Sequence, residues 1–165
     1  MKRYVAPMKI ARNSITLRNT SRGVAALEGE GPCPGVSSRV QAACDECGAP
    51  HDASWFARPD IKQRFAPVAE NVRLYLGGTV EEKTELARFV SPSTYISREC
   101  PPMLLIHGDA DAAVPVEETV EFHGALQAAG VDSTLEVLPG VGHGWDAALT
   151  RDRIVAFFLR TLGRD

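Results

Sequence analysis

The sequence predicts an α/β fold in which a mostly parallel sheet is flanked by helices. Short β-rich runs alternate with longer helical patterns, which is typical of right-handed βαβ units. One run, residues 103–108 (MLLIHG), is continuously apolar, as expected of a parallel strand buried on both faces. The length of 165 residues and the 44% hydrophobic content fit a single domain, residues 1–165, with its own core.

Four runs are expected to form strands: residues 14–17 (SITL), 40–46, 103–108 and 133–140. Three helical patterns separate or follow them: residues 60–76, 116–130 and 146–163. The first is interrupted or begun near Pro67 and closed by Gly77-Gly78, since proline breaks helices and glycine ends them. The apolar stripes expected to face the core are Val116, Val120, Leu126 and Ala129, and then Ile154, Val155, Phe158, Leu159 and Leu162.

Composition and charge narrow the range of partners. The formal net charge is −3, so nothing predicts binding to nucleic acid. The basic N-terminal stretch before Glu28 is interpreted as a frayed, solvated N-terminus rather than a functional basic arm. No run is long and apolar enough for a membrane span, and no signal peptide is visible. We therefore expect a cytoplasmic protein with no membrane or nucleic-acid partner.

The cysteines raise the question of a metal site, because Cys44 and Cys47 form a C-x-x-C pair and His51 follows. Residues three apart on a strand point to opposite faces, which argues against a shared metal ion. A zinc site also needs further ligands at matching spacing. We expect reduced, mostly buried thiols, with no metal and no organic cofactor.

Three loops at the expected carboxyl ends of strands carry Ser21, Asp111 and His143. A serine hydroxyl becomes a nucleophile when an imidazole takes its proton and a carboxylate orients that imidazole. The chain order Ser, Asp, His is one in which such triads occur. The alternative interpretation of Ser21 is a helix N-cap, for which serine is a favoured residue.

Other polar and aromatic residues receive structural interpretations. His107 is expected to be hydrogen-bonded at a strand end, Asp109 to shape the loop before Asp111, and His123 to lie at the surface or its boundary. His51 and Asp52 are expected in a turn, although they could line the pocket. Trp145, beside His143, is expected to pack rather than to stack on a substrate, and Phe157 and Phe158 are expected in the core.

The stretch 91–145 resembles the C-terminal part of α/β-hydrolase-fold esterases, in the prolyl oligopeptidase-like and ferulic-acid-esterase-like group. "HGDADAAVP" resembles the loop of the triad acid and corresponds to Asp111. "PGVGHGW" resembles the histidine loop and corresponds to His143. The resemblance extends more weakly over residues 36–90 and 12–29, and implies that segment 52–100 is a cap-like excursion.

The sequence also departs from the family's motifs. The family's nucleophile turn is G-x-S-x-G, whereas this chain has Asn19 in the first glycine position before Ser21. The backbone N–H of Arg22 would supply one oxyanion-hole donor, but the early strands and their H-G-G motif do not precede it. The sequence therefore resembles the C-terminal half of the fold, a partial α/β-hydrolase sheet without the N-terminal strands.

The function expected from these residues is serine hydrolase chemistry on small carboxylic esters. The alternative is a non-catalytic or truncated hydrolase remnant that pairs with itself or with another chain. An edge strand at residues 14–17 would leave unpaired backbone groups, so we expect a homo-oligomer formed through that edge.

Overall fold

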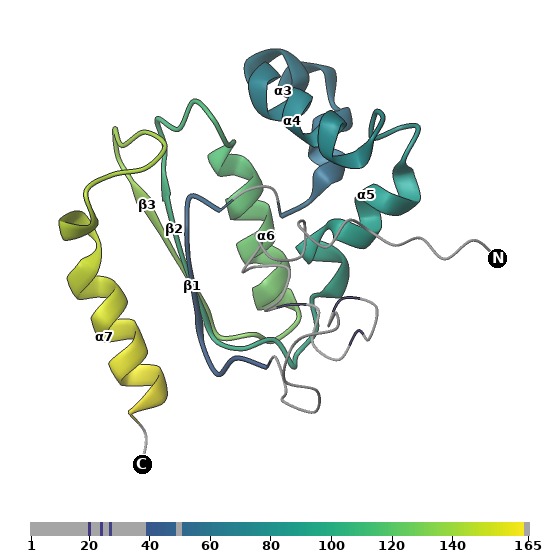
Figure 1. The fold of residues 1–165 in the computed structure, drawn as a ribbon. Coiled ribbons are helices and arrows are strands. Elements are labelled where there is room, and N and C mark those ends of the chain that lie inside the picture. The colour runs from purple at the N-terminus through teal and green to yellow at the C-terminus, as the bar shows by residue number, and fades with distance from the viewer. Residues whose placement is uncertain (1–19, 21–23, 25–26, 28–38, 49–50, 164–165) are drawn as a thin grey trace, which may run out of the picture.

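The computed structural model describes Thr20, Val24, Leu27 and residues 39–48 and 51–163. These residues contain a parallel sheet with a helix on each face (Figure 1). The predicted α/β fold class is confirmed. The strand expected at residues 14–17 lies outside the described residues.

The sheet has the strand order β1 (Ala43–Glu46), β2 (Met103–Gly108) and β3 (Ser133–Leu138), and both pairings are parallel. All six residues of β2 are buried, because it lies between the other strands and has a helix on either side. The three strands end at the same edge of the sheet. Their following loops therefore meet there, which is where open α/β sheets place their sites.

Alternate residues of β2 face two separate hydrophobic clusters. Met103 and Leu105 pack with Phe122 of α6 (Val116–Ala128). Leu104 and Ile106 pack with Phe157 of α7 (Arg151–Leu162) on the other face (Figure 1). The alternation follows from the two-residue period of a strand.

The chain between β1 and β2 forms short helices around a third hydrophobic cluster. They are η1 (Ala53–Ala57), α3 (Pro59–Arg64), α4 (Ala66–Leu76), α5 (Thr84–Val90) and η2 (Pro92–Tyr95). The expected helix 60–76 is broken at Phe65, because Pro67 cannot donate the hydrogen bond that would join the two halves. Gly77 ends α4 in the left-handed conformation, as predicted.

The two long helices bury only some of the residues that their apolar spacing predicted, among them Leu126. In α6 the buried residues are Glu118, Thr119, Phe122 and Leu126, whereas Val120 is 46% exposed. The helix turns two polar side chains inward because both have buried partners, as described below.

In α7, Phe157 is buried and Phe158 is half-buried, which agrees with the predicted core role. The expected inward stripe is wrong at Val155, Leu159 and Leu162, which are exposed. A helix lying on one sheet face buries only one side, and here that side centres on Phe157. The start of the expected segment 146–163 forms a separate turn, η3 (Ala147–Leu149), before α7 begins.

Within the described part of the chain, no helix has the length and apolar character needed to cross a membrane.

Candidate active site

An acid–histidine pair lies where the loops after β2 and β3 meet. His143 Nδ1 is 2.8 Å from Asp111 Oδ2. The Asp111 side chain is fully buried, whereas that of His143 is 46% exposed. The imidazole therefore lies between a buried carboxylate and the solvent.

Asp111 is held in place by backbone N–H groups of its own loop. Its Oδ1 accepts the backbone N–H groups of Ala113 at 2.7 Å and Val114 at 2.9 Å. Burial acts to raise the pKa of Asp111, but the hydrogen bonds from Val114, His143 and Ala113 outweigh it and lower the pKa below its ordinary value. The carboxylate is consequently ionised at neutral pH, as required of a group that stabilises an imidazolium.

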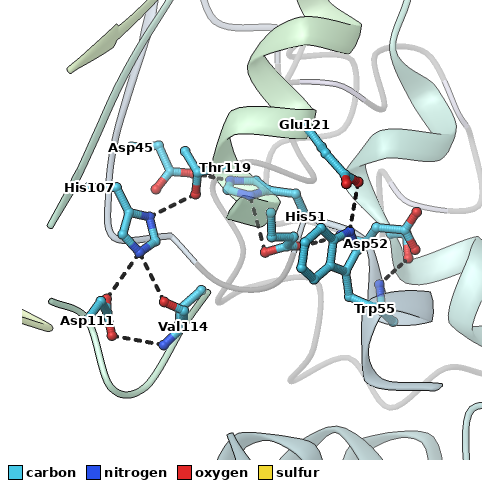
Figure 2. A network of polar contacts seen from close by, with 12 residues as sticks. Asp45, His51, Asp52, Trp55, His107, Asp111, Val114, Thr119 and Glu121 are labelled. Atoms are coloured by element: carbon cyan, nitrogen blue, oxygen red, sulfur yellow. Dashed lines mark hydrogen bonds and ion pairs between the residues drawn. The ribbon is translucent and has the colours of Figure 1, made fainter. Parts of the chain in front are cut away.

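A second histidine also contacts Asp111. His107 Nε2 lies 3.1 Å from Asp111 Oδ2 and 3.3 Å from the carbonyl oxygen of Val114 (Figure 2). Because both partners are acceptors, Nε2 carries the hydrogen, and Nδ1 is left to accept from the Thr119 hydroxyl at 2.8 Å. The expected hydrogen-bonded role of His107 is confirmed. Its contact with the acid was not expected from the sequence.

The two loops are tied to each other as well. Asp109 Oδ1 accepts the backbone N–H of Gly140 at 2.6 Å, and Ala110 N–H donates to the carbonyl oxygen of Val141 at 3.0 Å. A side chain at Gly108 would collide with that same carbonyl group. Asp109 therefore joins the acid loop to the histidine loop.

The remaining predicted site residues, Ser21 and the backbone N–H of Arg22, lie outside the described residues. Their roles as nucleophile and oxyanion donor stay predictions. The structure brings together Asp111 and His143 from the predicted set.

Cys47 is a neighbour that the sequence did not connect to the pair. Its Sγ, a carboxylate oxygen of Asp111 and a ring nitrogen of His143 all lie within 4.8 Å of one another. Cys44 instead packs with the cluster between the sheet and α7. Both thiols are free in the structure, as is Cys100. The signal in the sequence was the position of Cys47 at the end of a strand, where Asp111 and His143 were also expected.

A separate, buried histidine network lies on the α6 side of the sheet. His51 Nε2 is 3.1 Å from Asp45 Oδ2, and its Nδ1 is 3.6 Å from Glu118 Oε2 (Figure 2). The ring stacks on Phe122 with a centroid distance of 4.2 Å. Burial acts to lower the pKa of His51, but the two carboxylates outweigh it and raise the pKa to about 9.

His51 was expected in a turn, and its sequence neighbours offer no hint of Glu118. The other Glu118 oxygen accepts the backbone N–H of Asp52 at 2.6 Å. The network therefore fastens the loop after β1 to α6 through a buried cation between two acids.

Two further expectations concern residues at the margin of the site. Trp145 packs against the α7-side cluster and donates to the Thr150 hydroxyl at 3.1 Å, which confirms packing. His123 is half-buried, as expected of a boundary residue, and its Nδ1 lies 2.8 Å from Ser133 Oγ.

Known proteins resemble this chain in sequence and in fold. The sequence profile of the BD-FAE family matches residues 16–126. Esterase LipC of Mycobacterium tuberculosis is 37% identical over 87 residues, which are 52% of this chain and 21% of LipC. Esterase LipQ of the same organism is 37% identical over 73 residues, covering 43% of this chain and 17% of LipQ.

Among solved structures, a bifunctional GH43-CE protein of Bacteroides eggerthii matches with a TM-score of 0.71 and 28% identity, over 88% of this chain and 20% of that one. The thermophilic esterase Est2 of Thermogutta terrifontis matches with a TM-score of 0.62 and 25% identity, over 88% of this chain and 51% of Est2. The chain thus spans about a fifth of LipC and about half of Est2. Because the family profile covers more than half of the residues, the chain belongs to the BD-FAE family and has the fold of the α/β-hydrolase esterases.

Proposed function

We propose that the chain hydrolyses carboxylic esters through Ser21, His143 and Asp111. The observation that carries this proposal is the 2.8 Å contact between His143 Nδ1 and Asp111 Oδ2. With Nδ1 engaged by the acid, Nε2 is the nitrogen left to accept the proton of a serine hydroxyl.

In the proposed reaction, Ser21 Oγ attacks the ester carbonyl while His143 Nε2 takes the hydroxyl proton. The imidazolium then gives that proton to the leaving alcohol, and an acyl-serine remains. A water molecule, deprotonated by the same nitrogen, attacks the acyl group, and the imidazolium returns the proton to Ser21 Oγ as the carboxylic acid leaves. The ionised Asp111 stabilises the imidazolium in both steps, and the N–H of Arg22 would donate to the oxyanion.

The relatives support an ester as the substrate class. LipC and LipQ are named esterases. Est2 was solved with propionate and with butyrate bound, and short carboxylates of this kind are products of short-chain ester hydrolysis. We therefore propose small esters with short acyl groups as substrates. We also propose that segment 52–100, which has its own hydrophobic cluster, is the cap of a single domain.

The test is hydrolysis of p-nitrophenyl acetate and butyrate by the wild type, Ser21→Ala and His143→Ala, together with fluorophosphonate labelling. Ser54→Ala and His123→Ala are matched controls, because Ser54 is exposed and His123 bonds only to Ser133 among the contacts described above. We expect labelling to require Ser21 and hydrolysis to require both Ser21 and His143. Equal rates in all five proteins, without labelling, would exclude the proposal.

A second candidate is a non-catalytic role in which the chain pairs with another copy through the sheet. The edge expected to pair, residues 14–17, lies outside the described residues, and this candidate rests on the tendency of strand edges to template pairing. Analytical ultracentrifugation tests it, since a monomer at all concentrations would contradict homo-oligomer formation. A cytoplasmic location stays an expectation from the sequence.

A further inference from the structure

The side chains of Cys47, Asp111 and His143 form a compact set of metal-ligating donors. One atom from each lies within 4.8 Å of the other two. They follow β1, β2 and β3 respectively, so the parallel sheet places all three at the same edge. Thiolate, carboxylate and imidazole are together the donors that borderline cations such as Zn²⁺ prefer, while Mg²⁺ and Ca²⁺ prefer oxygen ligands.

We propose that Cys47, Asp111 and His143 bind a divalent cation of the zinc class, with a fourth position open to water. Three protein ligands and one open position are common in tetrahedral zinc sites. The partly exposed His143 ring provides the entry side, because 46% of its side-chain surface is accessible.

The backbone holds Cys47 in position for this role. Its N–H donates to the carbonyl oxygen of Ile106 at 2.8 Å, which fixes it against the end of β2. Its φ of 42° is uncommon for a residue other than glycine. The backbone of Cys47 is thus fixed against the strand that precedes Asp111.

The donors need only small movements to bind a cation. With metal–ligand distances of about 2.0–2.3 Å, tetrahedral ligands stand roughly 3.5 Å apart. Asp111 and His143 would open slightly from their 2.8 Å contact, and the thiol already lies within 4.8 Å of both. Asp111 is fixed by Ala113 and Val114, so the exposed His143 ring is the part that can adjust.

The charge around Cys47 also favours a cation. The carboxylates of Asp111, Asp45 and Glu46 all act electrostatically on the Cys47 thiol. The same negative charges would attract a divalent ion. Binding would replace the thiol proton with the metal and release that proton to solvent.

Occupancy would block the acid–histidine pair. A cation on His143 Nδ1 would displace its hydrogen bond to Asp111, and a cation on Nε2 would occupy the nitrogen that faces a nucleophile. Either arrangement removes the base, so zinc should inhibit ester hydrolysis; this consequence alone rests on the proposed function.

The binding test uses the full chain, stripped of metal with a chelator and titrated with Co²⁺. We expect one bound Co²⁺ with a thiolate-to-metal charge-transfer band and tetrahedral d–d bands, all displaced by Zn²⁺. Cys47→Ala should abolish the charge-transfer band and weaken binding beyond the roughly 10–100-fold that loss of an outer-shell partner costs. Cys44→Ala, on the α7 side, should bind Co²⁺ like the wild type.

Two results would overturn the proposal: no charge-transfer band in the wild type with Co²⁺ in large excess, or an equal band in Cys47→Ala. Circular dichroism of each variant checks that it is folded. Ser21→Ala separates this inference from the proposed function, because it should lose ester hydrolysis and keep Co²⁺ binding. If the wild type hydrolyses no ester but binds Co²⁺ through Cys47, the metal site stands and the esterase proposal falls.

Discussion

The molecule contains two histidine–carboxylate arrangements with opposite properties. His51 is 2% exposed and lies between Asp45 and Glu118, whereas the His143 side chain is 46% exposed and contacts Asp111 alone among carboxylates in the described residues. The pKa of His51 rises to about 9, because the two acids outweigh the effect of burial. The raised pKa favours the protonated form of His51 at neutral pH.

The difference shows how the surroundings of a histidine decide whether it suits a structural or a chemical role. A cation enclosed by two acids and stacked on Phe122 holds elements together but cannot exchange its proton with a substrate. A histidine on one well-fixed acid, with its other side open to solvent, can take and return a proton. Substitutions in each arrangement test this division of roles.

The largest effect is expected at the acid of the exposed pair. In Asp111→Asn the amide oxygen can keep accepting from Ala113 and Val114, while the amide nitrogen faces His143 Nδ1 and stabilises the wrong tautomer. We expect kcat for p-nitrophenyl butyrate to fall about 10⁴-fold. Asp132→Asn, at an exposed position, is the control. A loss under tenfold in Asp111→Asn would show that the pair is not the catalytic one.

Removal of the enclosed histidine should instead affect stability. His51→Ala leaves two carboxylates facing a buried space, and we expect the free energy of unfolding to drop by about 3–5 kcal/mol. His143→Ala should cost less than about 1 kcal/mol, because its side chain is half exposed. Urea denaturation measures both values. Equal losses in the two variants would contradict the division of roles.

The pH dependence of stability gives a third test. The pKa of His51 is about 9 when folded and 6.5 ordinarily, so its stabilising contribution is complete below about pH 6.5 and disappears as the pH rises through about 9. Over this window we expect a loss of a few kcal/mol, measured by urea denaturation at each pH. His51→Gln cannot titrate, and its stability should change less. Parallel profiles for the two proteins would mean that His51 is neutral in the folded state.

The smallest effect is expected at His123, for which no ion pair with a carboxylate is found in the described part of the chain. His123 contacts the Ser133 hydroxyl, and burial lowers its pKa, so it is neutral at pH 7. His123→Ala should cost about 1 kcal/mol or less, the usual value of one neutral hydrogen bond. Thermal unfolding of the variant beside His51→Ala measures the contrast. A loss as large as that of His51→Ala would show that carboxylate partners do not explain the difference.

The local amino-acid sequence was sufficient to predict the central strand and several helix boundaries. The apolar run 103–108 matches β2 residue for residue, since an uninterrupted apolar run suits only a fully buried strand. The stop at Gly77 and the break near Pro67 follow from backbone geometry that these residues carry in any fold. Asp111 and His143 were recognisable because each follows a strand, in a short motif that resembles the corresponding loop of the esterases.

The inward face of α6 was not predictable in the same way. Spacing of apolar residues favoured Val120, but the helix buries Glu118 and Thr119, whose partners are His51 and His107. A buried polar group is tolerable only when another group satisfies it, and such partners come from distant parts of the chain.

The residues alone thus settle the α/β class, the strand and helix signals, and which loops carry an acid and a histidine. They do so because propensity, turn chemistry and apolar patterning act over a few neighbouring positions. The packed molecule was needed to place Cys47 beside Asp111 and His143 and to enclose His51 between two acids. Those contacts join residues from separate strands and helices, and burial then sets their protonation.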